Sequence, residues 1–572
     1  MRWMAMVVVS VGVTGCASAQ WAAASSMAAD QFPKKEQLQR VALREPKLDL
    51  ARDSARAIDQ WTLKGPLPTS ASVEHVQPKT PWEVAIAQDV PAFGTALSVD
   101  MQCIAREVSH YYLARSEYPG NLLQSFIARR CGSTVEDPRL WALSGDVPAG
   151  VSDEQWLANW REQLKGLSKI QAPLTGVSVL REGTKGVLVV AWGTPEAEFS
   201  KPIQFVGLRE SIVVRGRVAK KNVVRIEALI NKGEYEVAEC KTLEVLQPPE
   251  FAFECPIDPR DTHTTLSIAA FESGRILGNG VASFSLWPSG TAPESWQRPA
   301  GSADVPKGDF NAQFLGAVNR MRQRAGLPLV GDTKEQSITA KMLAPHYLAA
   351  ALGKGDSHDA DDIALGMMAG WDVPLDVVSS GFGSQALLGS RDLSVFMDFA
   401  LDSPFTRKAL TEPRAQLIAI GSVDDADHAL AAIFATYVPL GLFERKESEA
   451  AIITRLNALR QDRKLGLAQW TLWPGDVGGM VEAKLKARVW TPVDAQQYVL
   501  EKTAEIAKGE VRGYVQLVDD LNNFQFPPEV LMRSDINVFL AVGTYRGEGW
   551  AQTRYVVCFV VAKTGDIETA SR

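Results

Sequence analysis

An internal repetition in the C-terminal half most constrains how this 572-residue chain can fold. Residues 308–442 and residues 445–565 each place an N-x-x-R-Q pattern on a stretch with helical apolar spacing, starting at Asn319 and at Asn457. A Gly-Leu pair follows each pattern, and each segment closes on two apolar runs that predict a β-hairpin. Internal similarity of this kind indicates repeated modules, although the period is longer than that of a solenoid.

Residues 96–205 are predicted to hold a third, weaker copy of the same plan. Helical apolar spacing extends over residues 101–115, 121–130 and 154–167, and a hairpin marked by Gly176 follows. Helices therefore lead into strands, as they do in the two C-terminal copies.

Residues 206–290 have a different character. They contain six short, β-branched runs bounded by turn residues, and this spacing predicts a small β-sandwich. The stretch from Pro288 to Pro306 is rich in turn residues and is predicted to be a linker. The chain is long enough for about four domains, and we predict a multi-domain α+β protein.

The N-terminus predicts export. A single basic residue, Arg2, precedes a short apolar run, so that residues 1–15 have the pattern of a signal peptide and are too short to span a bilayer. The sequence that ends in Cys16 resembles a bacterial lipobox, which implies that Cys16 is acylated and anchors the mature chain, with Ala17 favouring the outer membrane. The alternative is cleavage after Ala19, which would release a soluble periplasmic or secreted protein.

Residues 16–95 are rich in Ala, Ser, Pro, Lys and Gln, and we expect them to form a tether with some helix over residues 35–60. The net charge is −7, and no stripe of Lys and Arg is interleaved with aromatic residues, which argues against nucleic acid as a partner. No later apolar run approaches the length of a transmembrane helix, so a membrane is expected to be reached only through the N-terminus.

The cysteines fit an oxidising compartment. Cys103 and Cys131 lie in neighbouring helical stretches, and Cys240 and Cys255 lie in neighbouring strands, so two local disulfides are expected. The alternative is that some of them are small buried apolar residues, which is the role expected for Cys558. Because the sequence has no C-x-x-C motif, a thioredoxin-type or zinc-ribbon protein is excluded.

Residues 308–442 carry an ordered series of short motifs. These are N-x-x-R, Gly-Leu-x-Leu, Ser-His-Asp, Ser-Pro-x-x-Arg and a hairpin glycine, which begin at Asn319, Gly326, Ser357, Ser403 and Gly421. The series resembles that of bacterial members of the CAP superfamily, relatives of the cysteine-rich secretory, antigen 5 and plant pathogenesis-related proteins. The resemblance implies an α-β-α sandwich with a cleft of two histidines and two glutamates, side chains that suit a divalent metal.

Only part of that polar site has a counterpart in this sequence. His358 matches the first histidine, Thr406 stands in place of the second, and no glutamate is present in residues 377–383. The resemblance therefore implies a reduced ligand cleft at His358, Thr406 and Arg407. The other two copies of the plan contain one histidine between them, His110, and are expected to keep the fold as a scaffold without the site.

The densest group of potential ligands is the segment 356–362. One interpretation is a metal or catalytic site in which His358 acts with Asp359 or Asp362. The alternative is a polar loop whose aspartates favour the positive N-terminus of the next helix, and acidic helix starts are common. The local signatures of serine hydrolases, zinc proteases and phosphate-binding loops are absent from the sequence.

These patterns predict an exported cell-envelope lipoprotein that binds a lipid, a glycan or an envelope protein without catalysis and without a cofactor. The leading site is the cleft of residues 308–442. One alternative is a metal-assisted hydrolase that uses His358. Another is a purely structural component of an envelope complex.

Overall fold

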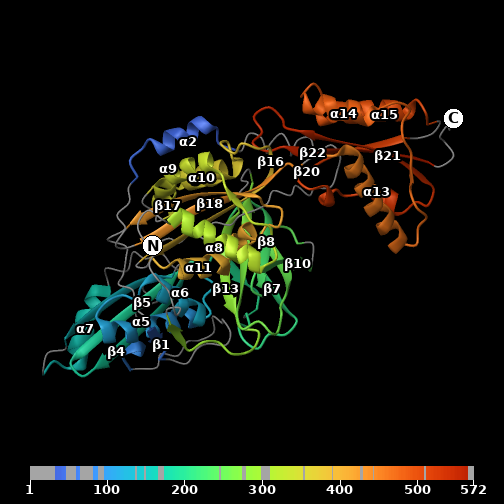
Figure 1. The fold of residues 1–572 in the computed structure, drawn as a ribbon. Helices are drawn as coiled ribbons and strands as arrows, with labels where there is room; N and C mark the ends of the chain where they lie inside the picture. The colour runs from blue at the N-terminus through green and yellow to red at the C-terminus, as the bar shows by residue number, and fades with distance from the viewer. Residues whose placement is uncertain are drawn as a thin grey trace.

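The protein is a multi-domain α+β chain, as the sequence predicts (Figure 1). The predicted signal peptide and Cys16 lie outside the described residues, in which no helix is both long and apolar enough to cross a bilayer. The computed structural model describes residues 32–46, 60–64, 81–87, 96–135, 138–146, 150–164, 173–201, 203–243, 246–273, 278–297, 310–351, 355–388, 391–425, 429–441, 443–507 and 511–563.

Three four-stranded sheets have the same strand order. In each, a two-residue edge strand runs parallel to the first strand of a central antiparallel hairpin, and the opposite edge strand pairs antiparallel with the second. The orders are β2-β4-β5-β3, β15-β17-β18-β16 and β19-β21-β22-β20. The strands are β2 (Ala96–Leu97), β3 (Arg139–Asp146), β4 (Leu174–Glu182), β5 (Lys185–Gly193), β15 (Gly331–Asp332), β16 (Val377–Leu388), β17 (Leu417–Asp425), β18 (Ala429–Pro439), β19 (Gln469–Trp470), β20 (Val511–Val518), β21 (Ile536–Tyr545) and β22 (Arg554–Lys563).

Helices cover both faces of the first and the last of these sheets. In the first, α5 and α6 share a core with one face, while α7 and α4 pack on the other. In the last, α13 and two short 3-10 turns lie on one face and α14 and α15 on the other. The elements are α4 (Pro81–Ala87), α5 (Val99–Arg115), α6 (Asn121–Arg130), α7 (Asp153–Leu164), α13 (Arg445–Asp462), η3 (Leu521–Asn523), η4 (Pro528–Leu531), α14 (Val477–Lys486) and α15 (Pro492–Ala504).

The middle sheet of the three shares one continuous hydrophobic core with five helices from its own part of the chain. We call the structure over residues 310–439 the central module, that over 96–193 the N-terminal module, and that over 445–563 the C-terminal module. The helices of the central module are α8 (Phe310–Arg324), α9 (Lys334–Ala351), α10 (Ser357–Ala369), α11 (Leu393–Asp402) and α12 (Pro404–Leu410).

The same glycine position brings a helix close to the sheet in all three modules. A Cβ atom on Gly176 would lie 2.0 Å from the main chain of α5, and one on Gly421 would lie 2.2 Å from the main chain of α9. On Gly543 it would lie 2.8 Å from a side chain of α14. Each glycine is on the first strand of the central hairpin, so the shared sequence feature has a shared packing role.

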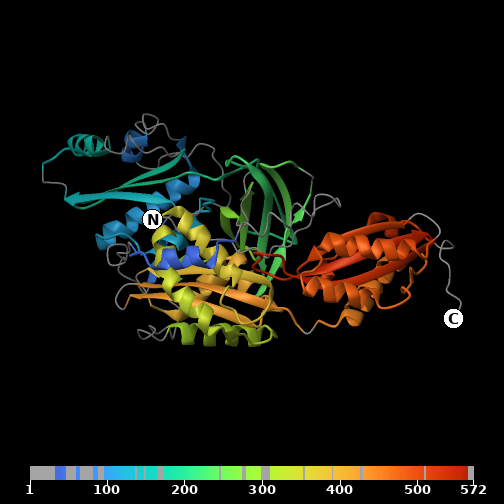
Figure 2. The same ribbon diagram turned by 90° about the horizontal axis from the view of Figure 1, so that it is seen from above.

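The β-sandwich lies between the N-terminal and central modules in the chain, and in Figure 2 its strands stand beside both of them. It consists of two sheets with orders β10-β11-β7-β6 and β13-β12-β8-β9 around one apolar core. All six predicted runs are strands, but the sandwich starts earlier than expected, with β6 inside the span 96–205. The strands are β6 (Ala197–Phe199), β7 (Ser211–Val218), β8 (Val223–Lys232), β9 (Glu236–Glu239), β10 (Lys241–Thr242), β11 (Glu250–Pro256), β12 (Thr264–Glu272) and β13 (Asn279–Leu286).

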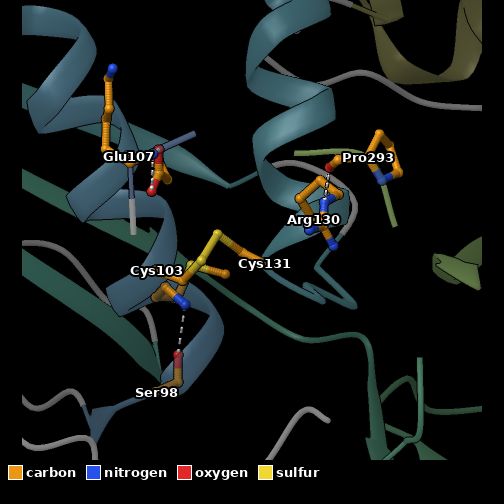
Figure 3. The surroundings of a disulfide bond; sticks show 8 residues. Ser98, Cys103, Glu107, Arg130, Cys131 and Pro293 are labelled. Carbon is orange, nitrogen blue, oxygen red and sulfur yellow. Dashed lines mark hydrogen bonds between the residues drawn. A yellow bond between two sulfur atoms is a disulfide. The ribbon is translucent and has the colours of Figure 1, made fainter. Parts of the chain in front are cut away.

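Both expected disulfides are present. Cys103 of α5 is bonded to Cys131, which caps α6, and the pair belongs to the core of the N-terminal module (Figure 3). Cys240 is bonded to Cys255 of β11 in the sandwich. Cys558 is a buried free thiol, as predicted, and burial raises its pKa to about 12.

The described parts of the predicted tether are packed and not extended. In α2 (Lys35–Ala42), Leu38 and Val41 enter the core of the central module. Trp61 of β1 (Gln60–Thr62) enters the core of the N-terminal module, where β1 pairs with β14 (Ser295–Gln297). These isolated apolar residues in a polar segment each lose contact with water in a core, which is the physical reason for the difference.

Candidate functional site

The N-x-x-R motif of the central module is a structural clamp. Arg322 is fully buried, and its guanidinium donates to four main-chain carbonyls. The adjacent Asn319 accepts from the N–H of Val330 and donates to its carbonyl, each at 2.9 Å, which fixes the entry to β15. The carbonyls that accept from Arg322 belong to Pro328 at 2.6 Å, Leu410 at 2.8 Å, Glu412 at 3.0 Å and Ala415 at 3.2 Å.

The C-terminal module repeats this clamp. Arg460 is fully buried as well, and Asn457 accepts from the N–H of Ala468 at 2.9 Å. The motif therefore joins a helix to two loops in both modules, and all three guanidinium nitrogens of each arginine donate to main-chain carbonyls. The carbonyls that accept from Arg460 belong to Gly466 at 2.8 Å, Val530, Arg533 at 2.8 Å and Ser534 at 3.2 Å.

His358 lies in the first turn of α10 and points to solvent. Its side chain is 88% exposed, and its Nδ1 is 3.3 Å from a carboxylate oxygen of Asp356. Asp356 caps the helix by accepting from the N–H of His358 at 3.0 Å. The acidic segment therefore acts as a helix start here, the alternative interpretation of its sequence.

Asp359 and His346 of α9 lie near the C-terminal end of α2. Asp359 forms an ion pair with Arg44 at 3.0 Å, just beyond the end of α2. Burial lowers the pKa of His346, and Asp359 opposes that shift. Burial raises the pKa of Asp362, and the charge of Asp359 adds to the shift. Within the described ranges no group of three or more His, Cys, Asp or Glu side chains could hold a metal ion.

Thr406 and Arg407 lie on α12, where the central module meets the sandwich. Thr406 is 2% exposed, and its N–H donates to the Oγ of Ser403 at the start of the helix. Arg407 donates to the carbonyl of Gly233 at 3.1 Å, in the turn between β8 and β9. In the part of the chain that is described, no hydrogen bond or ion pair joins either residue to His358. His358 is 88% exposed, whereas Thr406 and Arg407 are buried.

Asp402 forms a polar junction of three parts of the molecule. It is the last residue of α11, and its side chain is 12% exposed. It pairs with Arg129 of the N-terminal module and accepts from the Oγ1 of Thr265 in the sandwich at 2.6 Å. His263 lies on the same side, with its Nδ1 3.7 Å from a carboxylate oxygen of Asp402. We call Arg129, His263, Thr265 and Asp402 the three-way junction.

The charges at the three-way junction favour the ionised carboxylate. Burial raises the pKa of Asp402, but Arg129, His263 and Thr265 outweigh it and hold the pKa below its usual range. Burial lowers the pKa of His263, although Asp402 opposes this. Next to the junction, Arg130 lies 5.1 Å from the ring of Trp287 and donates to the carbonyl of Pro293 (Figure 3).

The C-terminal module is joined to the central module through the loop between β21 and β22. Gln552 is buried and donates to the Oγ of Ser380 at 2.8 Å, and the N–H of Thr553 donates to the carbonyl of Val377 at 2.8 Å. These contacts cover the beginning of β16, which falls in the segment where the CAP resemblance would place a glutamate.

A cavity of about 310 Å³ lies in the sandwich, where β6 leaves the edge of β7. It was not predicted from the sequence, because its lining crosses the boundary at residue 206 between two expected domains. The junction residues Asp402 and Arg129 were also missed, since they are far apart in the sequence and no spacing signals their contact. The cavity is lined by Phe199, Ser200, Lys201, Ile203, Gln204, Leu208, Ser211, Ile212, Val213, Val214 and Arg215.

Comparisons with known proteins find distant structural similarities. No family model and no curated protein matches the sequence. Solved structures that match include a cysteine-rich secretory protein from Staphylococcus aureus and an extracellular protein with an SCP domain from Bacillus anthracis. Each is 11% identical, with a TM-score of 0.17, over 48% of this chain and 91% of the other. A TM-score of 0.17 is too low to establish a shared fold.

Proposed function

We propose that this protein is an exported cell-envelope scaffold that binds partners without catalysis and is built from three degenerate CAP-like modules around a β-sandwich. The observation that carries the proposal is the use of the motif arginines. Arg322, Arg460 and Arg407 all donate to main-chain carbonyls, and their role is to hold helices, loops and modules together.

The hydrogen bonds of Arg407 support a structural role for this side chain. Its Nε donates to the carbonyl of Leu401, while Nη1 donates to the carbonyl of Gly233. A guanidinium that turned towards a substrate would leave these buried acceptors without a donor, which costs about 1–3 kcal/mol for each group. The side chain is therefore fixed where α12 meets the sandwich.

Export is supported by the N-terminal sequence and by the disulfides. Disulfides persist in oxidising compartments and are rare in the cytosol. In this proposal Cys16 carries the lipid that anchors the chain to the outer membrane, and cleavage after Ala19 would instead give a soluble envelope protein. The ligand is a lipid, a glycan or an envelope protein.

The test is a comparison of the mature full-length chain with its His358→Ala variant. We expect native mass spectrometry to show no stoichiometric divalent metal and chromogenic ester, peptide and phosphate substrates to show no turnover that depends on His358. Lys341→Ala, at an exposed site on the adjacent helix α9, is the control. Hydrolysis that is lost in His358→Ala and retained in Lys341→Ala would establish the hydrolase instead.

The anchor is tested separately by labelling cells with a palmitate analogue. We expect the wild-type chain to be labelled and to fractionate with membranes, and Cys16→Ser to be unlabelled. A wild-type chain that is unlabelled and starts at Gln20 would show that the protein is soluble.

A further inference from the structure

Strand β7 is paired along most of its length on one side and along only part of its length on the other. On one side, residues 211–217 are in register with β11. On its other side β6 pairs only with the last three residues, and the contact ends where the N–H of Ser200 donates to the carbonyl of Arg215 at 2.9 Å. β6 is the last strand of this sheet, so on the β6 side residues 211–214 pair with none of the named strands of the described chain.

The direction of the main-chain groups along this open edge follows from the existing pairs. In an antiparallel sheet, alternate residues direct their N–H and C=O to opposite sides. The carbonyl of Arg215 accepts on the β6 side, while Glu210 accepts from Ile257 on the β11 side at 2.9 Å. The N–H and C=O of Val213 and of Ser211 therefore point to the open side. Unpaired groups of this kind are a template for another strand.

The edge is open because the chain after β6 crosses to the opposite sheet. The N–H of Trp287, just after β13, donates to the carbonyl of Phe205 at 2.7 Å, and the N–H of Gly207 donates back to the carbonyl of Trp287 at 3.1 Å. Val206 and Trp287 form a parallel bridge. Residues 205–207 are held against the opposite sheet, and the cavity of about 310 Å³ lies beside residues 211–215.

The lining of the cavity defines the chemistry of an occupant. Ile203, Leu208 and Ile212 give it an apolar side, and each is less than 8% exposed. Its two charged residues, Lys201 and Arg215, are both cationic, and no acidic residue lines it. An extended segment with alternating apolar and acidic side chains matches both properties, because alternate side chains of a strand point to opposite faces.

We propose that the open edge of β7 binds an extended, acidic segment of a partner protein, which adds to the sheet as a strand. Main-chain hydrogen bonds to Val213 and Ser211 provide the affinity, and the apolar side of the cavity and the cationic Lys201 select the sequence. The site lies on the sandwich and goes beyond the proposed function, because it holds whether or not the chain is anchored to a membrane.

The probe is a fluorescein-labelled hexapeptide of alternating Val and Glu, titrated into the mature full-length chain and followed by fluorescence anisotropy. We expect saturable binding, and hydrogen exchange of the Val213 amide should slow when the peptide is bound. The same peptide with N-methylated backbone amides should not bind. A peptide with Lys in place of Glu should bind at least about tenfold more weakly.

Two variants test the site from the protein side. Val213→Pro removes the donor on the open edge and leaves the pairing with β11, and we expect it to abolish binding, whereas Val213→Thr should retain it. Lys201→Glu, at an exposed position, should reduce the preference for the Glu peptide without affecting the fold.

Equal binding of the N-methylated and unmodified peptides would overturn strand addition. Unchanged exchange of the Val213 amide in the presence of saturating Glu peptide would do the same. If the Glu and Lys peptides bind equally to both the wild type and Lys201→Glu, the assigned ligand chemistry is wrong.

Discussion

Buried guanidinium groups determine much of how individual residues act in this protein. Arg322 and Arg460 occupy equivalent places in two modules, and burial lowers the pKa of each. An arginine nevertheless stays protonated in a protein, so its donors must be satisfied within the fold. Main-chain carbonyls of distant loops meet that need, which turns a charge into a crosslink between segments.

We predict that Arg322→Met lowers the free energy of unfolding of the central module by about 3 kcal/mol or more, because four carbonyls lose their donor. Urea unfolding of the mature chain measures the loss, with hydrogen exchange assigning it to the module. The control is Arg320→Met, on the exposed side of the same helix, which should change stability by less than about 0.5 kcal/mol. Equal effects of the two substitutions would contradict the clamp.

The sequence located this motif but not its role. Arg322 reaches the carbonyl of Leu410, 88 residues later, and no local spacing announces such a contact. For His358 the sequence pattern suggests a ligand-binding role. In the fold its side chain is 88% exposed and lies beside Asp356, which caps its helix. Site residues in this chain are defined by long-range packing, which a motif does not encode.

At the scale of helices and strands, periodicity was informative where an element is long and half-buried. The six runs of the sandwich and the hairpin at Gly176 are strands, and the helical spacings correspond to helices. The two-residue edge strands β2, β15 and β19 were not predicted, because so short an element has no periodicity and exists only through its partner. β3 was also missed, and its largely half-exposed residues explain the weak pattern.

We predict that Gly421→Ala destabilises the central module by about 2 kcal/mol or more, because the added methyl group would meet the main chain of Ala340 at 2.2 Å. The control is Gly331→Ala in the same sheet, whose methyl group would have its nearest neighbours at 3.9 Å. Thermal unfolding of both variants provides the comparison. A Gly421→Ala variant as stable as Gly331→Ala would show that α9 does not pack as closely as described.

The docking of α2 is also testable. Leu38 is 3% exposed and packs against Gly366 of α10. A Cβ atom added to Gly366 would lie 2.3 Å from the side chain of Leu38. Leu38→Asp should detach the helix, since eight residues do not form a stable helix alone, and amide exchange over residues 35–42 should become fast. Gln39→Asp, on the exposed side of α2, should leave exchange slow. Slow exchange in both variants would count against the docking.

At the scale of the whole molecule, charged groups connect the parts. The three-way junction joins the N-terminal module, the sandwich and the central module, and Arg414 and Asp520 form a further ion pair at 2.7 Å between the central and C-terminal modules. Interfaces of this kind fix how the parts are oriented only while their charges are kept. The pH dependence of stability should therefore report on them.

Two aspartates on α11 are expected to have opposite effects on the stability of the fold at pH 7. The pKa of Asp402 is lowered, so its ionised form stabilises the fold above the usual Asp range near 3.8, and this contribution is lost as the pH falls through its folded pKa. The pKa of Asp398 is raised to about 6 by burial and by Asp392 and Asp402. Between about pH 6 and pH 3.8, Asp398 binds a proton more readily in the native state than in the unfolded chain. Asp398 therefore increases stability as the pH falls through that range.

We predict that Asp402→Asn lowers the melting temperature at pH 7 and makes the molecule larger by small-angle X-ray scattering, because Arg129 loses its partner. Asp398→Asn should leave the melting temperature at pH 7 unchanged or raise it. It should also remove the gain in stability that the wild type shows between pH 6 and pH 4. A loss of stability in Asp398→Asn as large as that in Asp402→Asn would show that the junction has no special role.

During synthesis, α2 can pack into its core only after residues more than 300 positions later in the chain have been made. The carbonyl of Pro33 accepts from the indole of Trp371, 338 residues later, and Leu38 and Val41 belong to the same distant core. A ribosome adding about 5–20 residues per second needs roughly 15–70 s to cover that interval. During this interval the apolar side of α2 has no native partner, so newly made chains present a site for chaperones that the finished protein conceals.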